Sequence, residues 1–239
     1  MKNNLFWDFY ALGYDALNLS LPHHEINKKI KEYAISDQKL TILDAGCGTG
    51  SLLLDISKLS KNIYIGIDFS SLMILIAKIK QLFSKRKNIK FIKQSIVHKL
   101  PFESKSVVMI ILVNVLFSLD NLNEVLAELY KILKKDGKIL IITPRKNYNY
   151  LFVIKKHFSE LSKLSIIRKI YILLLTLLAL PAFIIITISN IIISGREKNG
   201  GYSQYSKNDI YNLLDMTNFS DIVINQIVAG QEWFVSATK

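Results

Sequence analysis

The stretch Leu43-Asp44-Ala45-Gly46-Cys47-Gly48-Thr49-Gly50 decides the fold of this chain. It closes a short β-rich run that begins at Leu40, and a run with helical spacing of leucines starts at Ser51. A tight turn from strand to helix needs glycines where the backbone approaches a ligand, because a Cβ would stand in the way. The helix that follows offers free N–H groups and the positive end of its dipole. The stretch therefore predicts a turn that binds a carboxylate or a phosphate.

A carboxylate at the end of the next strand extends this site. Asp68 closes the run Ile63–Asp68 and follows Gly48 by 20 residues. A carboxylate there can accept two hydrogen bonds from ribose hydroxyls. The glycines are spaced GxGxG, whereas the dinucleotide fingerprint is GxGxxG. The turn and the acid together predict a nucleoside-containing ligand with an anionic tail.

Strands and helices alternate five times between Leu40 and Pro144, which is typical of a parallel sheet with crossover helices on both faces. Val107–Val113 is a continuous apolar run, as expected for a strand buried on both faces. The alternation of strands and helices ends near the C-terminus. The expected elements there are a helix over 207–216 with Ser206 as its N-cap, and two strands over 222–228 and 233–237 that form an antiparallel pair at the sheet edge.

The glycine-rich stretch is the first of five motifs that follow one another along the chain: LDAGCGTG, GIDFSSLM, KLPF, VNVLFSLDN and ELYKILKKDGKILIITP. In this order they resemble the class I S-adenosylmethionine-dependent methyltransferases, and most of all the small-molecule branch that includes the ubiquinone/menaquinone-biosynthesis type. The resemblance covers residues 7–145 and resumes at YSQYSKNDIYNLLDMTNF. It implies a Rossmann-like α/β fold, with a seven-stranded mostly parallel sheet, the antiparallel C-terminal strand pair and an inserted apolar helical cap. It also implies S-adenosyl-L-methionine as the cofactor.

The resemblance implies a role for each residue that matches its motifs. Asp44, Gly46 and Gly48 contact the methionine moiety with Cys47 in the turn between them, Asp68 binds the ribose hydroxyls, Phe69 and Met73 pack beside the adenine, Ser95 and Ile96 line its edge, and Asn114 lies next to the methyl-bearing sulfur. Tyr14, on an N-terminal helix that closes over the cofactor, and Asn114 are the candidate catalytic residues. The family usually carries an acid where this chain has Ser95, and an aspartate where it has Val108. A cofactor-binding relative without catalysis is therefore one alternative, and a membrane-associated scaffold with the same fold is another.

The residues after the fourth strand exclude some classes of methyl acceptor. Val113-Asn114-Val115-Leu116-Phe117 lacks the Asn/Asp-Pro-Pro-aromatic motif of amino-methylating nucleic-acid enzymes, so nucleic acid is not the expected substrate. Four histidines and one cysteine show no metal-ligand spacing, so no metal site is predicted. The expected partner is a small molecule whose accepting atom the sequence leaves open.

An apolar insertion separates the core from its C-terminal elements. Residues 170–195 number 26 and carry no charge, which is long enough to cross a bilayer. The strands before and after belong to one sheet, however, so both ends lie on the same side, and Pro181 breaks a helix. We predict two short helices, preceded by a stretch over 151–169 with five basic residues and one acid. This composition indicates an element at an anionic membrane surface; a buried cap and a re-entrant or spanning segment are the alternatives. A hydrophobic or lipid-like acceptor follows if the cap touches lipid.

Composition sets the remaining expectations. The formal net charge is +12, and Cys47 excludes an intrachain disulfide because the chain has one cysteine. The N-terminus lacks a signal-peptide pattern, so we expect a cytoplasmic protein that can sit peripherally at the inner face of the membrane. The expected organisation is N-terminal lid helices over 1–38, a cofactor-binding core over 39–145, the basic and apolar insertion over 146–200, and a C-terminal helix and strand pair over 201–239.

Overall fold

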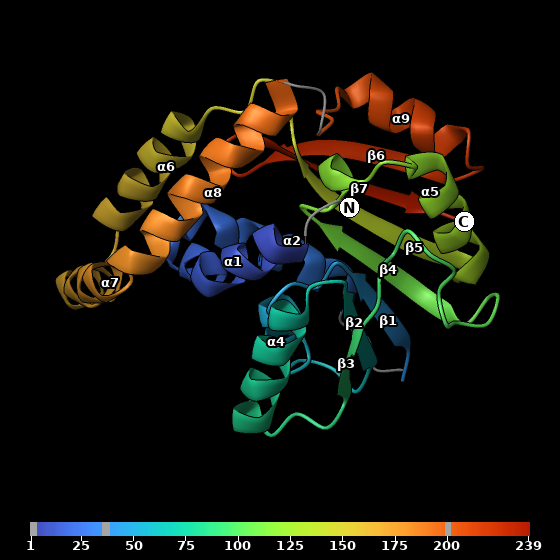
Figure 1. Ribbon diagram of the computed structural model, residues 1–239, viewed down its shortest axis with the longest axis horizontal. Coiled ribbons are helices and arrows are strands. Elements are labelled where there is room, and N and C mark those ends of the chain that lie inside the picture. The colour runs from blue at the N-terminus through green and yellow to red at the C-terminus, as the bar shows by residue number, and fades with distance from the viewer. Residues whose placement is uncertain (1–3, 35–38, 199–201) are drawn as a thin grey trace.

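The computed structural model of the protein describes residues 4–34, 39–198 and 202–239 (Figure 1). The expected boundaries at residues 38 and 200 lie outside these described residues. The strands are β1 (Thr41–Ala45), β2 (Ile63–Asp68), β3 (Ile89–Lys93), β4 (Val107–Val113), β5 (Leu133–Pro144), β6 (Ser220–Ile227) and β7 (Glu232–Thr238). The helices are α1 (Asn4–Tyr14), α2 (His24–Ala34), α3 (Ser51–Ile56), α4 (Ser71–Ser84), α5 (Leu122–Ile132), α6 (Tyr150–Ser162), α7 (Ile166–Leu178), α8 (Leu180–Lys198) and α9 (Lys207–Asp215), with 3₁₀ turns η1 (Asp15–Leu19), η2 (Leu21–His23) and η3 (Leu116–Ser118).

The sheet has seven strands in the order β3-β2-β1-β4-β5-β7-β6. The first five are parallel, whereas β7 runs antiparallel to both β5 and β6. The predicted fold class, including the antiparallel C-terminal pair, is confirmed. The antiparallel direction of β7 has a consequence for the site, since it places the start of β7 beside the end of β5, with Glu232 opposite Pro144.

Each face of the sheet carries its own apolar core. Successive side chains of a strand point to opposite faces, and β4 shows this clearly: Ile110 and Leu112 pack with α5 and α9, whereas Met109 and Ile111 pack with α2, α3 and α4. Burial on both faces explains why β4 is a continuous apolar run. The start of α9 is fixed by a reciprocal capping box between Ser206 and Asp209.

A third layer covers the carboxyl ends of the parallel strands. Helix α1 packs on α4 and on α8, and α6 and α7 contact the 3₁₀ turns that follow α1. Figure 1 shows α6, α7 and α8 as an arm on the far side of α1 from the sheet. Gly13 permits the close crossing of α1 and α8, because a Cβ there would lie 2.6 Å from the carbonyl oxygen of Ala182.

The insertion forms three helices, and the basic stretch over 151–169 is divided between α6, the short connection after it and the first turn of α7. Helix α7 ends at Leu178 and α8 begins at Leu180. Pro181 therefore lies in the first turn of α8, where proline is tolerated. Among the described helices, none is alone long and apolar enough to cross a bilayer, whereas Ile166–Leu178 and Leu180–Arg196, bent by 66°, meet those criteria as a pair.

The dipeptide Asp136-Gly137 by itself predicts a turn before a strand that starts at Lys138, but in the structure both residues lie within β5. Strand β5 begins at Leu133 and runs through both residues, with Leu133 opposite Val107 and Lys138 opposite Met109. The extra residues between these pairs form an irregularity in the strand, and Asp136 takes a positive φ of 62° there. Bulges of this kind bend a strand without ending its pairing.

Candidate functional site

The glycine loop between β1 and α3 is held against the neighbouring strand. The backbone N–H groups of Gly46 and Cys47 both donate to the carbonyl of Ile67 in β2, at 2.8 and 2.9 Å. Gly46 has a φ of +88°, and a Cβ there would lie 2.3 Å from Cγ2 of Val115. Gly48 has a φ of +53° and faces the ring of Tyr14. The loop therefore requires glycine at Gly46 for steric reasons, and at both positions for conformation.

Asp68 organises this loop from the end of β2. Its Oδ2 accepts a hydrogen bond from the Gly48 N–H at 3.0 Å, and its Oδ1 accepts one from the Ser70 N–H at 2.9 Å. Burial raises the pKa of Asp68, while these backbone hydrogen bonds lower it. A carboxylate has about four lone-pair positions, so Asp68 retains acceptor capacity toward the cavity.

Asp44 is the second buried acid of the loop. It is 2% exposed, and its Oδ1 has no hydrogen-bond partner. Burial, followed by the proximity of Asp68, raises the pKa of Asp44 to about 8. A buried carboxyl without a partner is costly, and a ligand with a cationic group would satisfy it.

The N-terminal segment closes over the loop through a polar cluster centred on Asp15. Its carboxylate accepts from the Thr49 hydroxyl at 2.6 Å, from the Ser51 hydroxyl at 2.9 Å and from the Lys80 ammonium at 2.8 Å. Asp8 makes a second attachment, because it accepts from the Leu72 N–H at 3.2 Å and from the Ser70 hydroxyl. These contacts tie α1 and η1 to the glycine loop and to α4.

A cavity of about 470 Å³ lies between the loop, the lid and the insertion. This is within the usual size range of small-molecule sites. It brings together most of the residues expected to bind the cofactor, together with Tyr14: Asp44, Gly46, Cys47, Gly48, Asp68, Phe69, Met73 and Asn114. Ser95 and Ile96 do not line it; Ile96 is 4% exposed within the core on one face of the sheet. Their contact with the adenine stays a prediction.

Two of the lining groups have protonation states fixed by burial. The pKa of the Cys47 thiol is raised well above its usual range, chiefly by burial, which keeps it a neutral thiol. Burial likewise raises the pKa of Tyr14, so its hydroxyl stays protonated and can donate a hydrogen bond. Neither residue is a nucleophile in this state.

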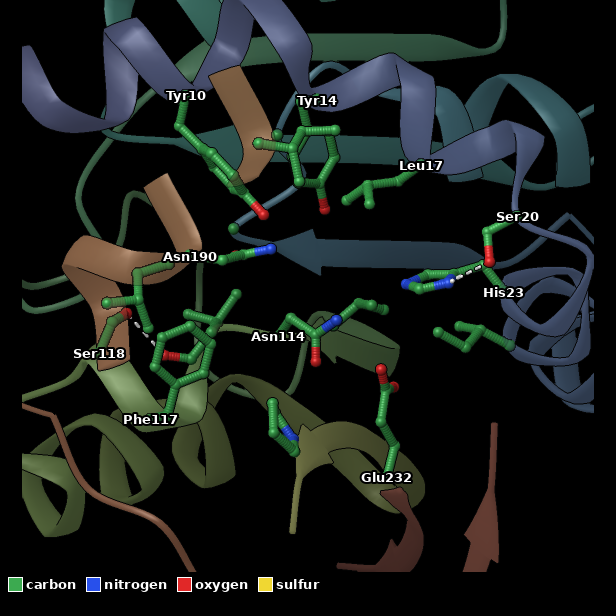
Figure 2. A pocket seen from close by; sticks show the side chains of 18 of the residues that line it. Tyr10, Tyr14, Leu17, Ser20, His23, Asn114, Phe117, Ser118, Asn190 and Glu232 are labelled. Atoms are coloured by element: carbon green, nitrogen blue, oxygen red, sulfur yellow. Dashed lines mark hydrogen bonds between the residues drawn. The ribbon is translucent and has the colours of Figure 1, made fainter. Parts of the chain in front are cut away.

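Asn114 lies where β4 ends, at the centre of the cavity (Figure 2). It takes a positive φ of 55°, and its backbone N–H donates to the carbonyl of Ile142 at 2.8 Å. Its side chain lies close enough to Glu232 to lower the pKa of that carboxyl group, and its Oδ1 is buried without a hydrogen-bond partner. Asn114 therefore connects the glycine-loop half of the cavity to a second half lined by the insertion.

Sequence reasoning missed several side chains of this second half. Figure 2 shows His23, Asn190 and Glu232 around the cavity with Asn114. Burial, followed by the neighbouring His24, lowers the pKa of His23 to about 4, so its ring is neutral at pH 7. The isolated acid Glu232 in the apolar run EWFVSAT was the one available signal.

The sequence was compared with known families and proteins. A profile described as a methyltransferase domain matches residues 36–216, which is most of the chain. The chain belongs to the methyltransferase domain family. A demethylmenaquinone methyltransferase of Lactococcus lactis subsp. lactis (strain IL1403) is 32% identical over 134 residues, which is 54% of this chain and 53% of that protein.

Two other methyltransferases are similar to this chain in sequence or in fold. A human tRNA N(3)-cytidine methyltransferase is 28% identical over 172 residues, covering 68% of this chain and 60% of that protein. The chain thus spans between about half and three-fifths of the length of these curated relatives. The crystal structure of a SAM-dependent methyltransferase from Aquifex aeolicus superposes with a TM-score of 0.61 at 18% identity, over 94% of this chain and 92% of that one. This likeness supports the shared fold.

Proposed function

We propose that this protein is an S-adenosylmethionine-dependent methyltransferase whose acceptor is a hydrophobic small molecule or lipid-like compound. One observation carries the proposal: a single cavity joins the glycine loop and its acids to a space bounded by the inner face of the insertion. When bound, S-adenosylmethionine supplies an activated methyl group on a positively charged sulfur.

The residues of the loop fit that cofactor. The unpartnered Oδ1 atoms of Asp44 and Asn114 offer acceptors for a cationic, hydrogen-bond-donating ligand. Asp68 has acceptor capacity for ribose hydroxyls, and Gly48 leaves room beside Tyr14 and Met73. Methyl transfer to a ready nucleophile needs alignment and exclusion of water, and the lid tied down by Asp15 supplies both.

The relatives point to two different acceptors. The name of the Lactococcus protein indicates a quinone, whereas that of the human protein indicates a tRNA base. The second half of the cavity favours the first kind, because it is lined by Tyr148, Tyr150, Val153, Phe183 and Ile186. We therefore place the acceptor among hydrophobic small molecules.

Binding of the cofactor to the empty protein is expected to release protons at pH 7. The pKa of Asp44 is about 8 in the empty site, and a cationic ligand favours the ionised carboxylate, so the proton leaves on binding. Affinity then rises with pH up to about 8. Calorimetric titrations with S-adenosylmethionine and S-adenosylhomocysteine, in buffers of different ionisation enthalpy, measure both effects.

The outcomes separate the competing functions. Micromolar binding together with transfer of a labelled methyl group into a lipid extract supports the proposal. Binding without transfer to any extract indicates a non-catalytic relative, and absence of binding in the intact protein contradicts the proposed function.

The outer face of the insertion supports association with an anionic membrane surface. Helix α7 has no buried residue, and Ile167 and Leu178 are 77% and 79% exposed. Exposed basic side chains accompany these apolar ones, among them Lys155, Lys163 and Arg168. An apolar face flanked by lysines and arginines suits the boundary between lipid headgroups and acyl chains.

Helix α8 links this outer face to the cavity. Phe183, Ile186 and Asn190 line the cavity, whereas Ile184 and Ile191 are 60% and 67% exposed. An acceptor dissolved in lipid would therefore have one helix between itself and the site. This arrangement supports a lipid-like acceptor.

Leu178→Asp is expected to weaken binding to vesicles that contain phosphatidylglycerol roughly 10- to 100-fold. Burial of a leucine side chain in the membrane contributes about 1.5–3 kcal/mol to the free energy of binding, and an aspartate in its place removes that contribution. Co-sedimentation with the vesicles measures the change. Leu82→Asp is the matched control, because Leu82 is 78% exposed but lies on α4. Equal loss in both variants, or no vesicle binding by the intact protein, would exclude the membrane proposal.

A further inference from the structure

Glu232 is a buried acid that the cofactor site does not use. It is the first residue of β7 and is 2% exposed. Because β7 runs antiparallel to β5, this first residue lies opposite Pro144, at the edge where the parallel strands end. The topology thus delivers a carboxyl group to the same edge as Asp44 and Asp68, but from the opposite side of Asn114.

The carboxyl group of Glu232 is not fully satisfied by the protein. Its Oε2 is buried with no hydrogen-bond partner, and the Asn114 side chain lies close enough to lower the pKa of the carboxyl group. Among the side chains that the structure describes, no lysine or arginine forms an ion pair with it. A buried acid that served only the fold would be expected to have its oxygens paired. Glu232 instead points into the cavity (Figure 2).

The surroundings of Glu232 favour a planar aromatic ligand. Tyr10 and Tyr148 are close enough that its charge raises the pKa of both hydroxyls, after the larger effect of burial. The ring of Tyr150 stands edge-on to Tyr148 at 4.7 Å between centroids. Rings pack favourably against rings in such offset or edge-on arrangements. A ring with a polar substituent would place that substituent at Glu232 and Asn114.

We propose that Glu232 takes the proton from a ring hydroxyl of the acceptor, while Asn114 holds the carboxylate in position. The proposal rests on the proposed function and deepens it, because it assigns the acceptor to the phenol class. A phenolic hydroxyl is largely protonated at neutral pH, so a base is needed for its oxygen to attack a methyl group.

The step balances with the groups at hand. The O–H bond of the acceptor breaks and its proton passes to Oε2 of Glu232, while the oxygen forms a bond to the methyl carbon. The carbon–sulfur bond of the methyl donor breaks, and its electron pair stays on sulfur. The products are the methyl ether, S-adenosylhomocysteine and a protonated Glu232, which then returns its proton to solvent.

Burial raises the pKa of Glu232 to about 8, with the nearby Asn114 side chain lowering it and the nearby Glu25 raising it. Glu25 comes from α2, Tyr10 from α1, and Tyr148 from the loop after β5. These are the titratable groups whose charges interact with that of Glu232. A base works best when its pKa lies near the working pH, so the geometry and the protonation state agree.

The test uses 2-naphthol as the probe with S-adenosylmethionine as the methyl donor. We expect the intact protein to form the methyl ether, with a rate that rises with pH toward about 8. Glu232→Gln keeps the size of the side chain and an oxygen acceptor near Asn114 but cannot take a proton. It is expected to lower kcat by about 100-fold or more and to remove the rise with pH, while KM stays within about threefold. Glu232→Asp, which retains a carboxylate, is expected to recover part of the rate.

A second readout needs no turnover. In the empty protein, the labelled carboxyl carbon of Glu232 is expected to titrate near pH 8 by nuclear magnetic resonance, and the signal is absent in Glu232→Gln. Glu103→Gln is the matched control, because Glu103 is exposed and does not line the cavity, so its variant should keep kcat.

Each adverse result has a distinct meaning. Retention of kcat by Glu232→Gln, titration of Glu232 at its ordinary value, or cofactor binding without transfer to 2-naphthol overturns the role of Glu232. Failure to bind S-adenosylhomocysteine overturns the proposed function itself.

Discussion

Asp68→Ala is expected to weaken binding of S-adenosylhomocysteine by about 100-fold or more. In the proposed function Asp68 accepts the ribose hydroxyls, and hydrogen bonds to a charged group contribute about 1.5–3 kcal/mol each. The variant also leaves the N–H groups of Gly48 and Ser70 without the acceptors that they have at 3.0 and 2.9 Å. The glycine loop then loses the contact that positions it for the ligand. Calorimetric titration measures the change in dissociation constant.

Two further variants separate binding from folding. Asp215→Ala removes an exposed carboxylate at the end of α9 and is expected to leave the affinity unchanged. Asp68→Asn keeps one oxygen acceptor, so it can satisfy the N–H of Gly48 or that of Ser70 but not both, and it loses the charge. Its unfolding temperature is expected to lie between those of Asp68→Ala and the intact protein, and it is expected to bind weakly. If Asp68→Ala binds as tightly as the intact protein, the ribose site lies elsewhere.

Gly46→Ala is expected to destabilise the fold by about 3 kcal/mol. Its φ of +88° is strained for any residue with a Cβ, and the new Cβ would lie 2.3 Å from Cγ2 of Val115, which is 7% exposed and cannot swing away. Left-handed strain costs about 1–2 kcal/mol and overpacking a further 1–3 kcal/mol. For a chain of this length the midpoint of thermal unfolding is expected to fall by about 6–12 °C. Thermal unfolding followed by circular dichroism measures it.

Gly195 provides the matched control for this substitution. It lies within α8, and a Cβ there would meet no atom within 4 Å. Gly195→Ala is therefore expected to raise stability by up to about 1 kcal/mol, as alanine does in a helix. An equal loss of stability in both variants would show that the effect at Gly46 is not the steric one argued above.

Much of the fold could be predicted because local rules act on short stretches. Val107–Val113 was assigned residue for residue, because a short continuous apolar run is what a strand buried on both faces requires. Ser206 was recognised as the cap of α9 because its hydroxyl meets the N–H of Asp209 three positions along. The irregularity at Asp136 escaped prediction, because a turn signal and a bulge share the same residues and differ only in what pairs across them.

Part of the site could likewise be predicted from the sequence and part could not. The sequence by itself determined the glycine loop, Asp44 and Asp68, because positive φ values call for glycine and an acid at the end of a strand can be recognised in the sequence. Only the tertiary structure decided that Glu232 faces Asn114, since this follows from the antiparallel direction of β7 beside β5, a pairing between residues about 90 positions apart. It also decided which face of α8 lines the cavity: α8 is apolar nearly all round, so its pattern marks no inner face, and packing against α1 selects one.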